Sequence, residues 1–157
     1  MEQLKTFKKG YQALRKGRRS LANHYYLVTS QTHNRAPIFI TKEPVQIVLE
    51  SLQWFRVRNL FSLDTAVVMP DHVHILGQLR EIPLENVMQR FKSYSSKSIK
   101  AHLNLSDPVW QPGYHDHIVR KEEDLNQVRQ YCLNNPVRAG LVNDFHAYAH
   151  WYCRWLV

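Results

Sequence analysis

The feature that most constrains the fold is a pair of apolar segments separated by a two-residue turn. Residues 61–69 and 72–79 are rich in β-branched and other apolar side chains, and Pro70-Asp71 stands between them. β-Branched residues favour strands, and Pro followed by Asp is typical of a tight turn. We therefore expect an antiparallel β-hairpin whose two strands belong to one sheet.

Further strands and helices alternate around this hairpin. Strands are expected where aromatic and β-branched residues gather, at 23–32, 61–69, 72–79 and 109–119. Helices are expected where apolar residues recur at spacings of three and four, at 44–55, 84–103 and 121–135. Pro136 disfavours helical backbone at the residue before it and ends or kinks the last helix. The order β-α-β-β-α-β, followed by a helix, predicts an α+β protein with the ferredoxin-like split βαβ fold. In this fold one antiparallel sheet has the strand order 4-1-3-2, and the helices pack against it.

The composition predicts one globular domain. The chain has 157 residues, of which 44% are hydrophobic and 22% charged. We expect a basic arm at 1–20, a core at 21–145 and an aromatic C-terminal tail at 146–157. No apolar run approaches the roughly 18 residues of a membrane span. No secretory signal is apparent, and the two cysteines lack a zinc-site spacing, so a cytoplasmic protein is expected.

The charge balance points to a polyanionic partner. Lys and Arg number 21 against 13 Asp and Glu, a formal net charge of +8. Basic side chains bind phosphates, and interleaved aromatic residues can stack on unpaired bases. For part of this set, a solvated helix face is an equally good explanation. The predicted DNA contacts in the arm and in the helix at 84–103 are Lys8, Lys9, Arg15, Arg18, Arg19, Arg90, Lys92 and Lys97.

Two His-x-His pairs are candidates for metal binding. His72 and His74 project from the same face of a strand because side chains alternate, and two such imidazoles can share a divalent cation. The alternative is that they only form hydrogen bonds. His115 and His117 have the same spacing, and by residue type the two pairs are nearly equal candidates. In strand order 4-1-3-2 they lie two strands apart, about 10 Å at ~4.8 Å per strand, so they cannot share one coordination shell.

The last helix carries a polar stripe beside its apolar one. Gln127, Tyr131 and Asn135 are successive i, i+4 neighbours and border the stripe of Leu125, Val128 and Cys132. In this position a phenol can attack phosphorus, and an amide oxygen can be a neutral metal ligand. The alternatives are a packed tyrosine and an asparagine that ends a helix.

Several motifs together resemble a known family. Met69-Pro70-Asp71-His72-Val73-His74 looks like the HUH motif of the single-tyrosine HUH transposases. Residues 110–117, 120–124 and 130–142 (beginning Trp110-Gln111-Pro112-Gly113 and Gln130-Tyr131-Cys132-Leu133-Asn134-Asn135-Pro136) resemble the REP-associated tyrosine transposases. The likeness extends over roughly residues 20–145, with the motifs in the same order and spacing.

This resemblance implies a metal-dependent enzyme that cleaves and rejoins single-stranded DNA at REP-like palindromic hairpins. Tyr131 would be the nucleophile, forming a 5′-phosphotyrosine intermediate. Mg²⁺ or Mn²⁺ would be held by His72 and His74, with Asn135 as a third ligand, although two imidazoles intrinsically favour Zn²⁺, Ni²⁺ or Cu²⁺. The resemblance thus favours the first histidine pair. It leaves a structural or DNA-contacting role for His115 and His117, and monomer or homodimer remains open. Arg120 and Arg138 complete the predicted DNA contacts.

Two other functions fit parts of this pattern. A non-catalytic module that binds single-stranded DNA or hairpins needs the basic and aromatic residues but not Tyr131 beside a metal. A metal-dependent hydrolase needs the histidines but uses water as its nucleophile.

Overall fold

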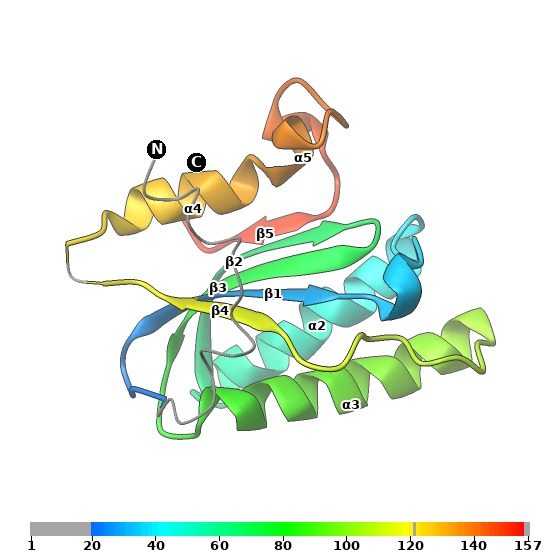
Figure 1. The fold of residues 1–157 in the computed structure, drawn as a ribbon, viewed down its shortest axis with the longest axis horizontal. Coiled ribbons are helices and arrows are strands. Elements are labelled where there is room, and N and C mark those ends of the chain that lie inside the picture. The colour runs from blue at the N-terminus through cyan, green and yellow to red at the C-terminus, as the bar shows by residue number, and fades with distance from the viewer. Residues whose placement is uncertain (1–19, 121, 156–157) are drawn as a thin grey trace.

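The computed structural model describes residues 20–120 and 122–155, which form one five-stranded antiparallel sheet covered by helices on both faces (Figure 1). The strands are β1 (Tyr25–Gln31), β2 (Phe61–Met69), β3 (His72–Leu79), β4 (His115–Ile118) and β5 (Trp151–Cys153). Their order is β4-β1-β3-β2-β5. The predicted α+β fold and the order 4-1-3-2 are therefore confirmed, and β5 extends the sheet beside β2.

The helices form two layers. Helices α2 (Lys42–Val57) and α3 (Leu84–Leu103) pack on one face, and α4 (Leu125–Leu133) and α5 (Asn135–Arg138) on the other (Figure 1). Two short 3-10 turns, η2 (His33–Arg35) and η3 (Phe145–Ala147), lie in the connections. The central strands are thus buried on both faces. This is why every residue of β2 except Ser62 is buried, where a strand with one solvated face would alternate buried and exposed residues.

The hairpin of β2 and β3 has the bounds that its residue pattern predicts, with Met69 opposite His72 across the Pro70-Asp71 turn. The apolar stripes predicted for α2 and α3 are also their buried faces. Within the described residues, no helix combines the length and apolar character needed to cross a bilayer.

Strand β4 is shorter than the predicted 109–119. Trp110 enters the core instead of continuing the strand: its ring centroid lies 5.5 Å from those of Phe39 and Phe91, and its Nε1 donates a 2.9 Å hydrogen bond to Ser95 Oγ on α3. One isolated bridge, from Thr32 to Trp110, is what remains of sheet pairing there. Regular pairing resumes at His115 after Gly113, whose φ of 77° is in the left-handed region that favours glycine.

The last helix also begins later than the predicted residue 121. The Asp124 side chain accepts a 2.8 Å hydrogen bond from the backbone nitrogen of Asn126, which caps α4 and sets its start at Leu125. The helix ends at Leu133, and α5 restarts at Asn135 with Pro136 in its first turn. The interruption expected from Pro136 is therefore present.

Candidate functional site

The histidines of β3 face the layer that contains α4. Leu76, which shares their side of the strand, packs in the core under α4, whereas Val73 and Ile75 pack in the core under α2 and α3. Val67 and Met69 on β2 lie opposite His74 and His72 and belong to the α4 core as well. The alternation expected from the sequence thus places both imidazoles beside the helix that bears Tyr131.

The two imidazoles are close and held in fixed orientations. Their ring centroids lie 4.8 Å apart with the planes at 89°. His72 Nδ1 is hydrogen-bonded to Asp71 Oδ1 at 2.6 Å, and Asp71 Oδ2 accepts a 2.9 Å bond from Arg35 Nε. His74 Nδ1 is hydrogen-bonded to Thr29 Oγ1 at 2.9 Å. Because both Nδ1 atoms are engaged, Nε2 is the atom through which each ring can bind a metal.

The surroundings favour the metal-binding form of His72. Burial lowers its pKa, and this outweighs the neighbouring Asp71 carboxylate, which acts to raise it. The imidazole is therefore preferentially neutral, as metal coordination requires. Burial also acts to raise the pKa of Asp71, but hydrogen bonds from His72 and Arg35 more than compensate, so that carboxyl has a lowered pKa. Asp71 is thus both a turn residue and the partner that orients His72.

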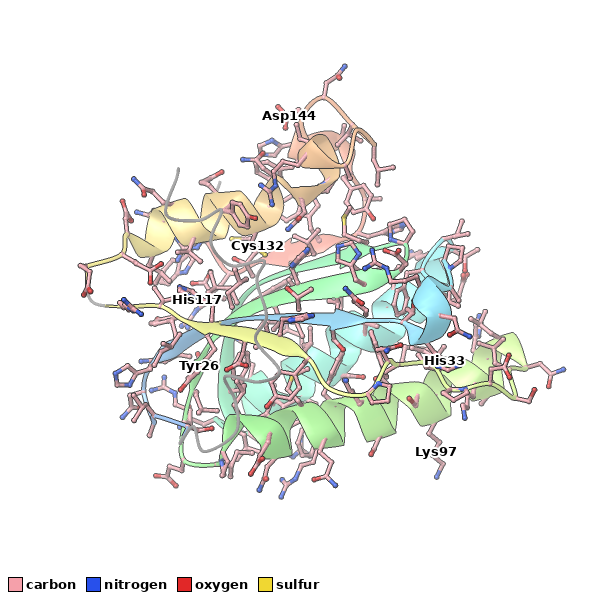
Figure 2. All side chains as sticks on the ribbon, in the orientation of Figure 1. Tyr26, His33, Lys97, His117, Cys132 and Asp144 are labelled. Atoms are coloured by element: carbon pink, nitrogen blue, oxygen red, sulfur yellow. The ribbon has the colours of Figure 1, made fainter. Side chains whose placement is uncertain are left out.

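The second histidine pair is separate from the first. His115 lies opposite Thr29, and Thr29 lies opposite His74, so β1 stands between the pairs as the predicted strand order requires. His117 Nε2 is hydrogen-bonded to Glu123 Oε1 at 2.9 Å, and Glu123 Oε1 also accepts a 3.0 Å bond from the Arg120 backbone nitrogen. His117 on β4 and the Arg120 backbone thus both bind Glu123, which holds the segment that connects β4 to α4. Figure 2 labels His117 at the start of this segment.

Helix α4 docks through its predicted apolar stripe. Val128, Cys132 and Leu133 are buried against Leu27 and the apolar residues flanking the histidines. Figure 2 shows Cys132 between α4 and the sheet, and burial raises the pKa of its thiol. Tyr131 is partly buried and packs against this cluster. The guanidinium carbon of Arg138 lies 3.8 Å from the centroid of the Tyr131 ring, a cation–π contact.

Asn135, the predicted third ligand, begins α5 and is partly buried. Its Nδ2 donates a 3.0 Å hydrogen bond to the carbonyl of Cys132. That bond turns the amide nitrogen back onto α4 and leaves the side-chain oxygen as the atom that can contact a cation.

The predicted DNA contacts are not gathered at one place. Arg90, Lys92 and Lys97 lie on α3, in the layer opposite α4, and Figure 2 shows Lys97 pointing away from the sheet. Lys92 Nζ donates hydrogen bonds to the carbonyls of Gln111 (2.8 Å) and Gly113, so it holds the segment before β4. Arg120 is exposed at the turn before α4. Lys8, Lys9, Arg15, Arg18 and Arg19 lie outside the described residues.

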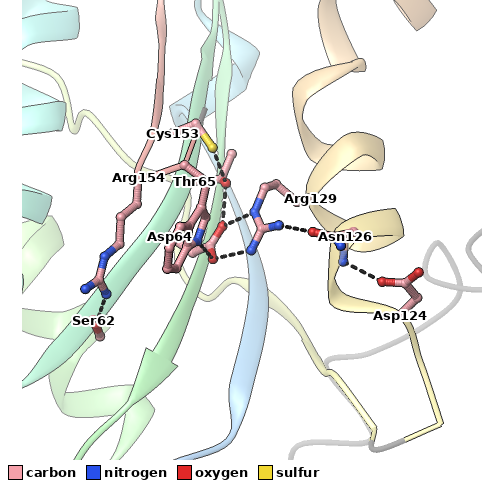
Figure 3. Close-up of polar contacts among 9 residues, drawn as sticks. Ser62, Asp64, Thr65, Asp124, Asn126, Arg129, Cys153 and Arg154 are labelled. Atoms are coloured by element: carbon pink, nitrogen blue, oxygen red, sulfur yellow. Dashed lines mark hydrogen bonds and ion pairs between the residues drawn. The ribbon is translucent and has the colours of Figure 1, made fainter. Parts of the chain in front are cut away.

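Sequence reasoning missed two features of this layer. One is Thr29, which comes from another strand to contact His74. The other is a buried ion pair of Asp64 on β2 with Arg129 on α4, drawn in Figure 3. The usable signal for the second was the single carboxylate in the strand predicted at 61–69, because a buried charge requires a partner.

The fold and these residues define a class: a single-sheet α+β protein that carries a histidine pair on its central strand beside a tyrosine-bearing helix. The family described as transposase IS200-like matches residues 20–135, so the chain belongs to this family of transposases.

Individual proteins are similar to this chain over part of its length. An uncharacterised protein of Haemophilus influenzae is 28% identical over 98 residues, covering 48% of this chain and 54% of that protein. A REP-associated tyrosine transposase of Escherichia coli is 27% identical over 84 residues, covering 54% of this chain and 49% of that protein. The chain thus spans about half the length of the curated relatives it matches.

A solved structure described as a REP-associated tyrosine transposase bound to a REP hairpin has a similar fold. Its TM-score is 0.69 at 19% sequence identity, over 85% of this chain and 79% of that one. Together with the family match, these similarities confirm the resemblance to REP-associated tyrosine transposases that the sequence motifs predicted.

Proposed function

We propose that this protein cleaves and rejoins single-stranded DNA at hairpin-forming sites, with Tyr131 as the nucleophile. The observation that carries the proposal is that two oriented imidazoles and the tyrosine helix share one face of the sheet. The family membership supports a role in processing DNA. The solved relative bound to a REP hairpin and the REP-associated curated relative support a REP-like hairpin as the substrate.

The reaction is a transesterification that needs no external energy source. The Tyr131 oxygen attacks a backbone phosphorus, so a bond from phosphorus to the phenolic oxygen forms and the bond to the 3′ oxygen breaks. The phenol gives up one proton, and the departing 3′ oxygen takes one up as a hydroxyl. The 5′ phosphate remains on the tyrosine. The same or another 3′ hydroxyl can then attack this link and restore both the phosphodiester and the phenol.

The histidine pair fits a divalent cation. The Nδ1 atoms of the two rings are held by Asp71 and Thr29, which is how protein surroundings orient metal-binding imidazoles. Among residues 20–120 and 122–155, no group of three or more His, Cys, Asp or Glu side chains could hold a metal ion. Further ligands would therefore be oxygens from the Asn135 amide, water or the DNA. Bound Mg²⁺ or Mn²⁺ supplies Lewis-acid polarisation of the phosphodiester and neutralises developing negative charge.

The remaining residues would hold the DNA. We propose that the basic side chains of the first twenty residues and of α3 bind phosphates of the hairpin DNA away from the cleaved bond. In this arrangement Arg138 acts close to the nucleophile, since it already covers the face of the Tyr131 ring. Residues 21–145 would carry the catalytic side chains, and the C-terminal tail adds strand β5 to the same sheet.

The test is a denaturing gel with an end-labelled single-stranded hairpin and Mn²⁺. Wild-type protein should yield a cut strand and a slower band of protein covalently joined to the 5′ end. Tyr131→Phe should yield neither while binding the same DNA nearly as well. Tyr94→Phe is the matched control, because Tyr94 is 60% exposed on α3, in the opposite layer, and its loss should leave cleavage unchanged.

The outcomes separate the alternatives. Cleavage that persists in Tyr131→Phe without an adduct would identify a hydrolase that uses water. DNA binding without cleavage by the wild-type protein under every divalent metal tried would identify a binding module.

A further inference from the structure

A β-bulge on β2 turns a carboxylate toward the tyrosine helix. The pairing register of β2 with β3 shifts between Leu63 and Thr65, and Asp64 is the extra residue. Bulges of this kind redirect a side chain and are frequent beside active sites. Leu63 packs in the core under α2 and α3, whereas Asp64 contacts α4. The bulge therefore delivers a buried acid to the layer that contains Tyr131.

The Asp64 carboxylate is fully engaged there. Arg129 binds it with two parallel bonds, from Nε to Oδ1 and from Nη2 to Oδ2, both 2.7 Å long (Figure 3). Thr65 Oγ1 donates to Oδ1 at 2.7 Å, and Trp155 Nε1 donates to Oδ2 at 3.0 Å. Arg129 Nη1 also donates to Asn126 Oδ1, within α4. The Arg129 and Asp64 side chains are only 9% and 4% exposed.

This contact constrains α4 in a way that its apolar stripe cannot. Apolar side chains pack with little directional preference, so a nine-residue helix held by them alone can slide or rotate slightly. A bidentate guanidinium–carboxylate pair has a fixed planar geometry and tolerates neither movement. Arg129 is two residues before Tyr131 on the same helix. Strand β2 is in turn paired with the strand that carries His72 and His74.

The C-terminal segment, which the sequence left unassigned, completes this contact. Strand β5 pairs with β2 so that Cys153 lies opposite Thr65. The Arg154 backbone nitrogen donates a 2.8 Å bond to the Asp64 carbonyl, and Trp155 follows it to reach the carboxylate. The last described residues thus cover the ion pair from the side opposite α4.

We infer that the Asp64–Arg129 pair, closed by Trp155, positions the nucleophile: it sets the placement of α4 on β2 and thereby that of Tyr131 relative to the histidine pair. Asp64, Arg129 and Trp155 are positioning residues and take no part in bond making. The inference rests on the proposed function, since it assigns these residues to the same transesterification.

Arg129→Lys is the principal test because it keeps the positive charge and removes the paired donors. We would measure three quantities: the single-turnover rate of adduct formation at saturating hairpin DNA, the affinity for the same DNA, and the unfolding midpoint. The rate should fall by roughly ten- to a hundredfold, the scale expected when a reacting group is slightly displaced. The DNA affinity should change by less than about twofold, since the pair is buried away from solvent.

Val48→Ala is the control for lost stability. Val48 is fully buried on α2, in the core on the other face of the sheet, so its truncation destabilises the fold without touching α4. It should lower the unfolding midpoint yet leave the adduct rate within about twofold of wild type. If Val48→Ala loses rate as Arg129→Lys does, the pair is merely structural and the inference is wrong.

Trp155→Phe provides a second variant should Arg129→Lys fail to fold. It removes the single 3.0 Å bond to Asp64 and should reduce the adduct rate by a smaller factor, about two- to fivefold, again with DNA affinity retained. Unchanged rates in the folded variants would overturn the positioning role alone. A wild-type chain that forms no adduct would overturn the proposed function and this role with it.

Discussion

Replacing Thr29 by valine isolates the contact that orients His74. Valine keeps the branched shape of threonine and puts a methyl group where Oγ1 now accepts or donates the 2.9 Å hydrogen bond to His74 Nδ1. Strand β1 should form as before, because valine is also a good strand former and the backbone pairing with β3 is unaltered. The change therefore acts mainly on one side-chain contact.

The expected magnitudes follow from that single contact. Loss of one partly buried hydrogen bond should lower the free energy of unfolding by about 1 kcal/mol. Loss of the partner that orients a metal-binding imidazole should weaken binding of the metal by about 10- to 100-fold, which corresponds to roughly 1.4 to 2.8 kcal/mol. Metal binding should thus suffer more than folding.

Calorimetric titration with Mn²⁺ measures the loss of metal affinity, and urea denaturation measures the loss of folding stability. The double variant His72→Ala/His74→Ala defines the signal that belongs to this site, since the chain has nine histidines. Thr29→Ser is the matched control: it retains the hydroxyl and should bind Mn²⁺ nearly as wild type does. Mn²⁺ affinity in Thr29→Val equal to that of wild type would refute the orienting role, as would equal weakening in Thr29→Ser.

Two further predictions concern the sheet. Gly77→Ala should lower the free energy of unfolding, measured by urea denaturation, by about 1 to 3 kcal/mol. The added Cβ would lie 2.3 Å from Phe61 Cε1 and 2.9 Å from the carbonyl oxygen of Ser62 on the paired strand β2. An unchanged free energy of unfolding would contradict this tight packing. Burial acts to raise the pKa of Asp64, but hydrogen bonds, foremost from Arg129, lower it below the ordinary value. The stabilisation from this group is therefore present above pH ~3.9 and lost as the pH falls from there through the lower native pKa. Denaturation at pH 3 compared with pH 6 should thus show a larger loss of stability in wild type than in Asp64→Asn.

Much of the fold could be predicted because it depends on local pattern. β-Branched and apolar composition, together with Pro70-Asp71, defined the hairpin closely, and helical periodicity defined the long helices α2 and α3. The shared face of His72 and His74 follows from the alternation of side chains along a strand. The late start of α4 had a local signal as well, the capping Asp124, which the apolar periodicity alone does not reveal.

What the sequence alone determined about this protein is therefore the set of elements, their order and the spacing of the reactive side chains within each. The tertiary structure decided which distant groups meet. It brought Thr29 to His74 across 45 positions of the chain, and closed Asp64 on Arg129 and Trp155 through a bulge and an added edge strand. Periodicity carries information over a few residues, whereas strand register and helix docking depend on the packing of the whole chain.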